Sequence, residues 1–354
     1  MKTHQIAVIA GDGVGQEVIP EVKRLLTPLQ AKHGFHLEYT DYPWGSDYYH
    51  QHGRMAPADF LEQLRKSEAI LLGAVGHPSV PDHITLNGLL LPIRRTFDQY
   101  ANIRPARLYK GVASPLALRR NEEIDLVVVR ENTEGEYAQI GGFVYHEQPE
   151  EVAVQTSVFT RRGVDRVVRV AFELARKRNR KKKVTSVTKS NAQGYSLVLW
   201  DRAFQAVAAE YPDIATETLL VDAAAMNFIR RPESFDVVVA SNLFGDILSD
   251  ISAMIVGSMG LAPSANLDPS RRNPSMFEPV HGSAPDIAFQ GIVNPLATFL
   301  CAAQMLEHLG HAVAAGEIEQ SIVTVLAETK IRTPDLGGRS KTAQVTDAVI
   351  AGLQ

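Results

Sequence analysis

The sequence predicts an α/β fold built around a largely parallel sheet. Runs of β-branched and other apolar residues alternate with segments of helical periodicity, which is typical of parallel sheets flanked by helices. Polar clusters follow several of these runs, and ligands of such folds bind beyond the carboxyl ends of the strands. The strand candidates are residues 5–10, 35–42, 69–72, 125–129, 183–188, 214–221 and 235–240.

Length and composition are those of a water-soluble enzyme-sized chain. The 354 residues are enough for two units with their own cores. The net charge of -4 gives no reason to expect a nucleic-acid partner. We find no signal peptide and no apolar run long enough to span a bilayer, so we expect a cytoplasmic protein without a membrane partner. Cys301, the single cysteine, lies in an apolar run and is expected to be a buried structural thiol.

The first strand candidate leads into the glycine-rich stretch Gly11-Asp-Gly-Val-Gly15 and then into a helical pattern. A strand, a glycine-rich turn and a helix form the context of a phosphate-binding loop. Residue 16, however, is Gln where the dinucleotide fingerprint requires Gly. The stretch therefore predicts either a phosphate-binding loop or a tight turn, and it does not predict a classical Rossmann fold.

The last strand candidate is followed by Asn242-Leu-Phe-Gly-Asp246-Ile-Leu-Ser-Asp250. Asn242 is a favourable N-cap residue for a helix that begins there. Asp246 and Asp250 lie one helical turn apart, so their carboxylates share a face. They are candidate ligands for a hard divalent cation, with Asp222 at another strand end as a third, although two solvated acids are the alternative. Zinc is not expected, because His281 has no second histidine at ligand spacing.

Three arginines lie near the ends of predicted strands or helices. If they converge, they could bind a dicarboxylic acid. They are Arg94, Arg104 and Arg130, whose guanidinium groups bind carboxylates bidentately. Each taken alone is more often a surface charge. Tyr137 and Lys189 are candidates for general acid–base catalysis. The alternatives are that Tyr137 is a packing residue and that Lys189 is a solvated surface residue.

Two segments predict features of the surface. Residues 141–144 and 152–159 are rich in β-formers and flank a polar stretch, which indicates a protruding hairpin suited to a dimer contact. Residues 176–183 form a basic run between a helix and a strand. Cations suit the end of a helix, and no aromatic residues interleave the run, so we interpret it as a solvated junction rather than a nucleic-acid patch.

Six segments together resemble the metal-dependent β-decarboxylating dehydrogenases, which include isocitrate, 3-isopropylmalate, homoisocitrate and tartrate/D-malate dehydrogenases. The resemblance covers essentially the whole chain and is strongest to the tartrate/D-malate branch, through residues 81–86 and 89–100. Asn87 departs from both the glutamate of the 3-isopropylmalate branch and the tryptophan frequent in the tartrate/D-malate branch. The segments are Gly11–Gly15, Asn102-Ile-Arg-Pro105, Arg130-Glu-Asn-Thr-Glu-Gly-Glu-Tyr137, Lys189-Ser-Asn191, Asn242–Asp250 and His281-Gly-Ser-Ala-Pro-Asp-Ile-Ala288.

The resemblance implies a two-domain fold with a large twisted central sheet. Residues 1–104 and 260–354 would form the cofactor-side domain. Residues 105–259 would form the domain for dimerisation and substrate binding, with a β-arm near residues 141–160. The implied partner is a second copy of the chain, and the active sites would be shared between the two subunits.

The resemblance also implies roles for individual residues. Arg94, Arg104 and Arg130 would hold the substrate carboxylates, with Asn87 and Leu90 beside the variable group of the substrate. Asp222 from the partner subunit, Asp246 and Asp250 would bind Mg²⁺ or Mn²⁺. Lys189, also from the partner, would assist removal of the hydroxyl proton, and Tyr137 would protonate the enol. The cofactor-binding residues would be His281, Gly282, Ser283, Ala284, Asp286 and Asn294.

The activity implied is NAD-dependent oxidative decarboxylation of a small 2-hydroxy dicarboxylic acid, D-malate or tartrate. Asp286 favours NAD, because its carboxylate can bind the ribose 2′-hydroxyl and repels a 2′-phosphate. A monovalent cation such as K⁺ is a further candidate cofactor. Two alternatives remain open: a 3-isopropylmalate dehydrogenase and a non-catalytic regulatory subunit of the same family.

Overall fold

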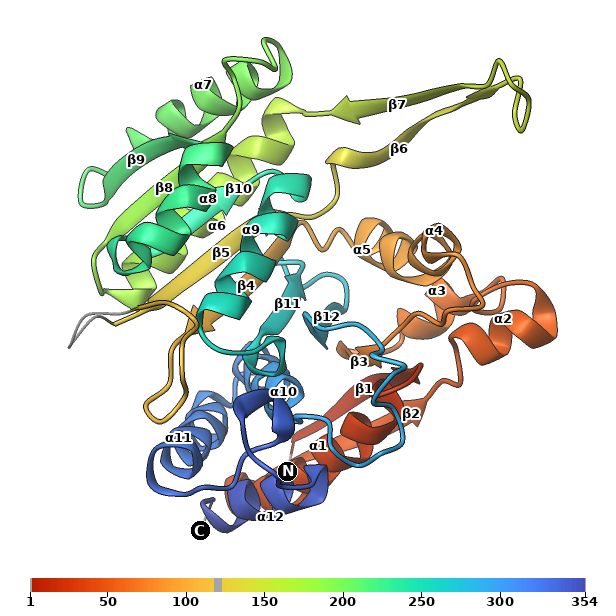
Figure 1. The fold of residues 1–354 in the computed structure, drawn as a ribbon, viewed down its shortest axis with the longest axis vertical. Helices are drawn as coiled ribbons and strands as arrows, with labels where there is room; N and C mark the ends of the chain where they lie inside the picture. The colour runs from red at the N-terminus through yellow and green to blue at the C-terminus, as the bar shows by residue number, and fades with distance from the viewer. Residues whose placement is uncertain (1, 118–122, 354) are drawn as a thin grey trace. The chain divides into compact units, whose positions relative to one another are not determined.

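The computed structural model describes residues 2–117 and 123–353, and the chain divides into two compact units (Figure 1). Unit 1 comprises Met1–Gln99, Ile103–Ile124 and Ser252–Gln354. Unit 2 comprises Tyr100–Asn102 and Asp125–Ile251. Residues 105–124, expected in the dimerisation domain, cluster with unit 1, where Ser114 Oγ donates to Ile255 O at 2.6 Å. The assignment of functional domains stays a prediction.

Unit 1 contains a mixed sheet in the strand order β2-β1-β3-β12-β11. The strands β2, β1, β3 and β12 run parallel to their neighbours, and β11 pairs antiparallel with β12. β4 (Ala101–Arg107) starts in the segment assigned to unit 2 and continues into unit 1. The other strands are β1 (Lys2–Gly11), β2 (Phe35–Asp41), β3 (Ala69–Ala74), β11 (Pro263–Leu267) and β12 (Ser275–Pro279).

Helices cover both faces of this sheet. Along β1, Ile6 and Val8 join one hydrophobic core with α1, α10, α11 and α12, whereas Ala7 and Ile9 join a second core with Trp44 and Phe97. A strand buried on both faces is apolar at successive positions, which is why the sequence shows runs rather than alternation. The helices are α1 (Gly15–His33), α2 (Ser46–His52), α3 (Phe60–Leu64), α4 (Asp82–Thr85), α5 (Leu91–Thr96), α10 (Leu296–His308), α11 (Ala312–Glu328) and α12 (Thr342–Ala351).

Unit 2 contains parallel strands in the order β5-β10-β8-β9 and a separate two-stranded antiparallel ribbon, β6–β7. The ribbon projects from the rest of unit 2 (Figure 1). The strands are β5 (Asp125–Glu131), β6 (Gly135–Val144), β7 (Val152–Val158), β8 (Lys183–Thr188), β9 (Ala215–Leu220) and β10 (Val237–Ala240). The helices are α6 (Arg161–Arg178), α7 (Ser196–Ala208), α8 (Val221–Arg230) and α9 (Asn242–Ile255).

Each predicted strand is present, with end points shifted by a few residues, and the predicted hairpin forms β6–β7. The strand β4 was not among the strand candidates, and neither were β11 and β12. The strands β11 and β12 each have five residues and include a proline, and neither shows a repeating apolar pattern. These segments form strands because they pair with other strands, not because of their own sequence pattern. Every residue of β12, which lies between β3 and β11, is buried.

Two expectations about buried and apolar segments have clear outcomes. Cys301 is fully buried on α10, and burial raises the pKa of its thiol, so the predicted structural role is confirmed. Within residues 2–117 and 123–353, no helix is both long enough and apolar enough to cross a membrane.

Candidate active site

The glycine-rich stretch after β1 is a tight turn. The backbone N–H of Asp12 donates to Ala74 O at 2.8 Å, and that of Val14 donates to Ser283 O at 2.9 Å. Gly13 has a φ of +52°, and a Cβ at this position would lie 2.2 Å from Ser283 O. The amides that would cradle a phosphate are already engaged, so the structure favours the tight-turn interpretation. The turn holds the loop at Ser283 against the start of α1.

Arg130 is the central buried cation of unit 2, with a relative exposure of 1% near the carboxyl end of β5. Its Nε and Nη2 both donate to Asn242 Oδ1, at 3.0 and 2.7 Å. Its Nη1 donates to Asp246 Oδ1. A Cβ on Gly245 would lie 2.7 Å from the Arg130 Cβ, so a glycine is needed there for α9 to approach β5. These contacts place a guanidinium group and a carboxylate side by side.

Tyr137 completes this cluster from β6. Its hydroxyl donates to Asp246 Oδ2 at 3.1 Å, and its ring lies 5.4 Å from the Arg130 guanidinium carbon. Burial and the charge of Asp246 raise the pKa of Tyr137, although Arg130 opposes this. The phenol therefore keeps its proton at neutral pH, as a general acid must.

Glutamates of the same segment hold the cluster in place, a role that the sequence analysis missed. Glu136 accepts hydrogen bonds from Ser241 Oγ at 2.8 Å and Leu243 N at 3.1 Å, at the start of α9. The prediction that Asn242 caps this helix is wrong, because Asn242 Oδ1 binds Arg130 instead and Glu136 satisfies a free helical N–H. Three glutamates within six residues were the only available signal in the sequence.

Glu131 is the most buried of these glutamates. Its carboxylate accepts hydrogen bonds from Thr133 N and Oγ1 and from Glu134 N, each at 2.9 Å. Burial raises its pKa to about 6, although these hydrogen bonds oppose the shift. The carboxylate therefore orders the turn that leads from β5 to Tyr137.

Lys189 and Asp222 form an ion pair elsewhere in unit 2, with Lys189 Nζ 2.7 Å from Asp222 Oδ1. Lys189 follows β8 and Asp222 follows β9, and these strands pair in parallel, Thr188 opposite Leu220. The hydrogen bond from Lys189 lowers the pKa of Asp222, which keeps that carboxylate ionised. Both predicted residues therefore lie together, as their places at neighbouring strand ends imply.

The substrate residues predicted in unit 1 are Arg94 and Arg104, each less than 8% exposed, together with Asn87 and Leu90. Arg94 Nη2 donates to Glu278 Oε1 at 2.7 Å. Asn87 is exposed and Leu90 is buried, and both lie in the π-helical turn Leu86–Leu90 that precedes α5. Such turns are frequent at functional sites. Convergence of Arg94 and Arg104 with Arg130 stays a prediction.

The predicted cofactor loop has the chemistry that an adenosine moiety needs. Burial lowers the pKa of His281, so its ring is neutral, and its Nε2 is buried without a hydrogen-bond partner among the described residues. Asp286 is exposed, and its carboxylate makes no hydrogen bond or ion pair with any described residue. Asn294 is buried and hydrogen-bonded to Leu296 N and Asp335 Oδ2. Gly282, Ser283 and Ala284 form the backbone between them, and these cofactor contacts stay predictions.

The predicted metal ligands have the right chemistry, because carboxylate oxygens are the donors that Mg²⁺ and Mn²⁺ prefer. Asp246 accepts hydrogen bonds from Arg130 and Tyr137. In the described part of this chain, no three His, Cys, Asp or Glu side chains are placed to hold a metal ion. The shared metal site of Asp222, Asp246 and Asp250 stays a prediction.

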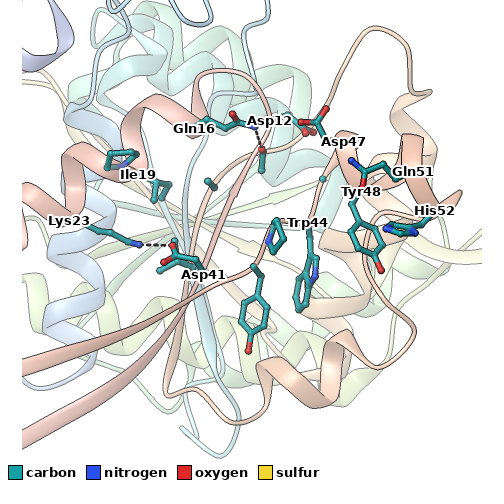
Figure 2. Close-up of a pocket in the computed structure, with 17 residues that line it drawn as sticks. Asp12, Gln16, Ile19, Lys23, Asp41, Trp44, Asp47, Tyr48, Gln51 and His52 are labelled. Atoms are coloured by element: carbon teal, nitrogen blue, oxygen red, sulfur yellow. Dashed lines mark hydrogen bonds and ion pairs between the residues drawn. The ribbon is translucent and has the colours of Figure 1, made fainter.

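A cavity of about 1060 Å³ opens in unit 1 between α1 and α2 (Figure 2). Trp44 and Tyr42 line it with stacked rings 4.2 Å apart, and Lys23 is paired with Asp41 at one end. None of the predicted substrate, metal or cofactor residues lines this cavity.

Comparison with known proteins identifies the class of this chain. A family model described as isocitrate/isopropylmalate dehydrogenase matches residues 5–349. The chain therefore belongs to the isocitrate/isopropylmalate dehydrogenase family, which consists of decarboxylating dehydrogenases. The resemblance predicted from the sequence is confirmed.

Its similarity to individual relatives is extensive. It is 51% identical over 356 residues to D-malate dehydrogenase [decarboxylating] of Escherichia coli, covering 99% of this chain and 98% of that protein. It is also 51% identical over 353 residues to tartrate dehydrogenase/decarboxylase of Pseudomonas putida, covering 98% and 96%. The crystal structure of isocitrate dehydrogenase from Methylococcus capsulatus matches with a TM-score of 0.88 and 34% identity, over 99% of both chains. The predicted α/β fold class is thereby confirmed.

Proposed function

We propose that this chain catalyses the NAD-dependent oxidative decarboxylation of a small 2-hydroxy dicarboxylic acid, D-malate or tartrate. The observation that carries the proposal is the cluster of Arg130, Asp246 and Tyr137, which brings a carboxylate binder, a metal-ligand candidate and an acid into contact. The names of the D-malate and tartrate dehydrogenases, each about half identical to this chain, support the substrate class.

In the proposed reaction, a bound divalent cation would lower the pKa of the substrate hydroxyl, and NAD⁺ would accept the hydride. Arg130 would hold one substrate carboxylate through a guanidinium group that burial and Asn242 fix in one orientation. The partner subunit's Lys189 would accept the proton of the 2-hydroxyl. Loss of CO₂ from the β-carboxylate then leaves an enol, and Tyr137 would deliver the proton that this carbon gains.

The proposal includes a homodimer with composite active sites. Apolar side chains on the β6–β7 ribbon and on helices α8 and α9 are about half exposed or more, which is typical of an interface rather than a free surface. In a twofold dimer, each subunit would contribute Lys189 and Asp222 to the other. The exposed side chains are Ile140, Phe143, Val144, Tyr145, Val152, Val154, Met226, Ile229, Ile247 and Met254.

A substrate panel tests the proposed function directly. With Mn²⁺ and NAD⁺, we expect NADH formation on D-malate or a tartrate, with kcat/KM at least about tenfold higher than on 3-isopropylmalate. Asn87 is polar and exposed, so it offers little favourable apolar contact to an isopropyl group. A preference for 3-isopropylmalate would assign the chain to leucine synthesis, and no NADH on any of these acids would indicate a regulatory subunit.

The choice of NAD over NADP depends on Asp286 in this proposal. Asp286→Lys is expected to lower kcat/KM for NAD⁺ by about tenfold or more, since it removes a charge-assisted hydrogen bond to the ribose. The matched control is Glu62→Lys, which makes the same charge change at an exposed position and should leave kcat/KM for NAD⁺ unchanged. Unaltered NAD⁺ kinetics in Asp286→Lys would contradict the assignment.

A further inference from the structure

A small basic pocket lies in unit 1 at the amino ends of β1, β3 and β12, with a volume of about 230 Å³. Four cationic side chains line it, against one carboxylate and one histidine. These residues are Lys2, Arg65, Arg271, Arg272, Glu68 and His308. This excess of positive charge belongs to a chain whose net charge is -4, so the pocket is locally opposite in sign to the whole molecule.

Three of these cations have no acidic partner. Among the described residues, Lys2, Arg271 and Arg272 make no ion pair, and Arg65 approaches only the exposed Glu62, at 3.9 Å. By contrast, Arg176 in the basic run at the end of α6 lies 2.6 Å from Asp213. Guanidinium groups gathered in a concavity without an acidic partner among the described residues can bind an anion.

The turn between β11 and β12 holds two of these arginines in place. Asp268 is 2% exposed, and its carboxylate accepts hydrogen bonds from Ser270 N and Oγ and from Asn273 N and Nδ2. The one acid of the turn is therefore occupied by the backbone and small side chains rather than by an arginine. Arg271 has a φ of +56°, in the left-handed region that costs most residues about 1 kcal/mol or more.

Other hydrogen bonds orient the remaining side chains. Arg272 Nε donates to Ser270 Oγ at 3.1 Å, and Arg65 Nη1 donates to Asn273 Oδ1 at 3.2 Å. Both partners are neutral, so the guanidinium groups keep their full charge and most of their donors. The only carboxylate that lines the pocket, Glu68, is bonded to His4 Nδ1 at 3.0 Å. Arg65 and Arg272 are thus oriented by neutral partners.

The pocket is distant from the predicted cofactor loop of the same unit. Lys2 begins β1 and Gly11 ends it, and a ten-residue strand spans about 30 Å. The cofactor loop contacts the turn at the Gly11 end, through Val14 N and Ser283 O. A ligand in the basic pocket would therefore leave the cofactor loop free.

We propose that this pocket binds a small oxyanion carrying at least two negative charges on phosphate or carboxylate groups, at a site separate from the active site. Guanidinium forks match both groups bidentately. The volume of the pocket admits a small anion or a group of a larger one, but not a protein segment. The phosphate and carboxylate classes are separated by the experiment.

The pH dependence of anion binding supplies a second test, through His308. His308 is partly buried at the end of α10, and burial, together with the nearby Arg271, lowers its pKa to about 4, although Asp268 opposes this. An anion beside Arg271 would relieve part of that repulsion and raise the pKa of His308. Binding would then take up a proton and tighten as the pH falls toward 5.

The test is calorimetric titration of the full-length enzyme at constant ionic strength. One arm uses sulfate, a tetrahedral dianion that stands for a phosphate group and keeps its charge from pH 8 to pH 5. The other uses tricarballylate, a tricarboxylate, in the presence of saturating D-malate, because the arginines of the proposed active site also bind carboxylates. Wild type is compared with Arg271→Gln/Arg272→Gln and with the control Arg169→Gln/Arg176→Gln, which removes the same charge from arginines paired with Glu210 and Asp213.

We expect wild type and the control to bind equally, and the Arg271/Arg272 variant to bind at least about tenfold more weakly, with unchanged activity in the absence of the anion. The arm with the lower Kd identifies the ligand class. In wild type, sulfate should bind more tightly at pH 5 than at pH 8, and His308→Gln should lose this dependence. Equal binding in all three proteins, equal weakening in both variants, or no saturable binding to wild type would overturn the proposal.

Discussion

Asp246→Asn is expected to lower kcat/KM on D-malate by about 100-fold or more while the protein stays folded. The substitution keeps the shape of the side chain but replaces one carboxylate oxygen by an amide and removes the charge. Asp246 is about one-third exposed, and Arg130 retains its two bonds to Asn242, so the cluster keeps most of its packing. A proposed metal ligand would be lost, and Arg130 would lose the carboxylate that it faces.

The measurement is steady-state turnover across a range of Mn²⁺ concentrations, with circular dichroism to confirm folding. If excess Mn²⁺ partly restores turnover, the defect lies in metal binding. The matched control is Asp47→Asn, an acid of the Figure 2 cavity that takes no part in the proposed site. Turnover at the wild-type level in Asp246→Asn would rule out its role as a ligand.

Hybrid dimers extend the same experiment to the composite site. Asp246→Asn and Asp222→Asn should each be inactive alone. If Asp222 acts across the interface, a hybrid of the two chains has one site with both lesions and one intact site. Random mixing makes half of the dimers hybrid, so about a quarter of wild-type activity should return. No recovery after verified exchange would show that Asp222 serves its own chain, and full activity of Asp222→Asn alone would show that it has no role.

The strands of this fold were predictable because the sheet in each unit is buried. The centre of β5, residues 126–129, reads as an unbroken apolar run, since these residues are buried on both faces of the sheet. The same reasoning placed Lys189 and Asp222 at strand ends, and the structure shows that these strands are neighbours and that the two residues form an ion pair. The strands β11 and β12 lacked any such pattern, because their burial depends on elements distant in the sequence.

Some residues of the candidate site could be predicted from the sequence, and others could not. Asp246 and Tyr137 were singled out by residue type and motif, and the structure brings them into contact. The contacts of Glu136 could not be predicted, because they depend on the approach of the start of α9 to the start of β6. Asn242 was predicted to cap α9, because asparagine commonly caps helices through local hydrogen bonds. In the structure its side-chain oxygen instead accepts a hydrogen bond from the buried Arg130.

Tyr137→Phe is expected to slow overall turnover by about 10²- to 10⁴-fold while leaving the first hydride transfer close to the wild-type rate. In the proposed order, the hydride leaves before carbon is protonated, and the phenol acts only in the second step. The substitution removes one hydroxyl and its bond to Asp246, which contributes about 1 kcal/mol to stability, so the fold should persist.

The distinguishing measurement is a rapid-mixing assay of NADH on D-malate. Tyr137→Phe should show a burst of about one NADH per site followed by slow turnover, because protonation of the enol then depends on water. The control is Tyr195→Phe, which removes a hydroxyl from a side chain that is 94% exposed and should behave as wild type. A slowed burst would instead assign Tyr137 to orienting Asp246 for oxidation. The two outcomes separate an acid from a positioning residue, because both roles use the same 3.1 Å hydrogen bond but at different steps.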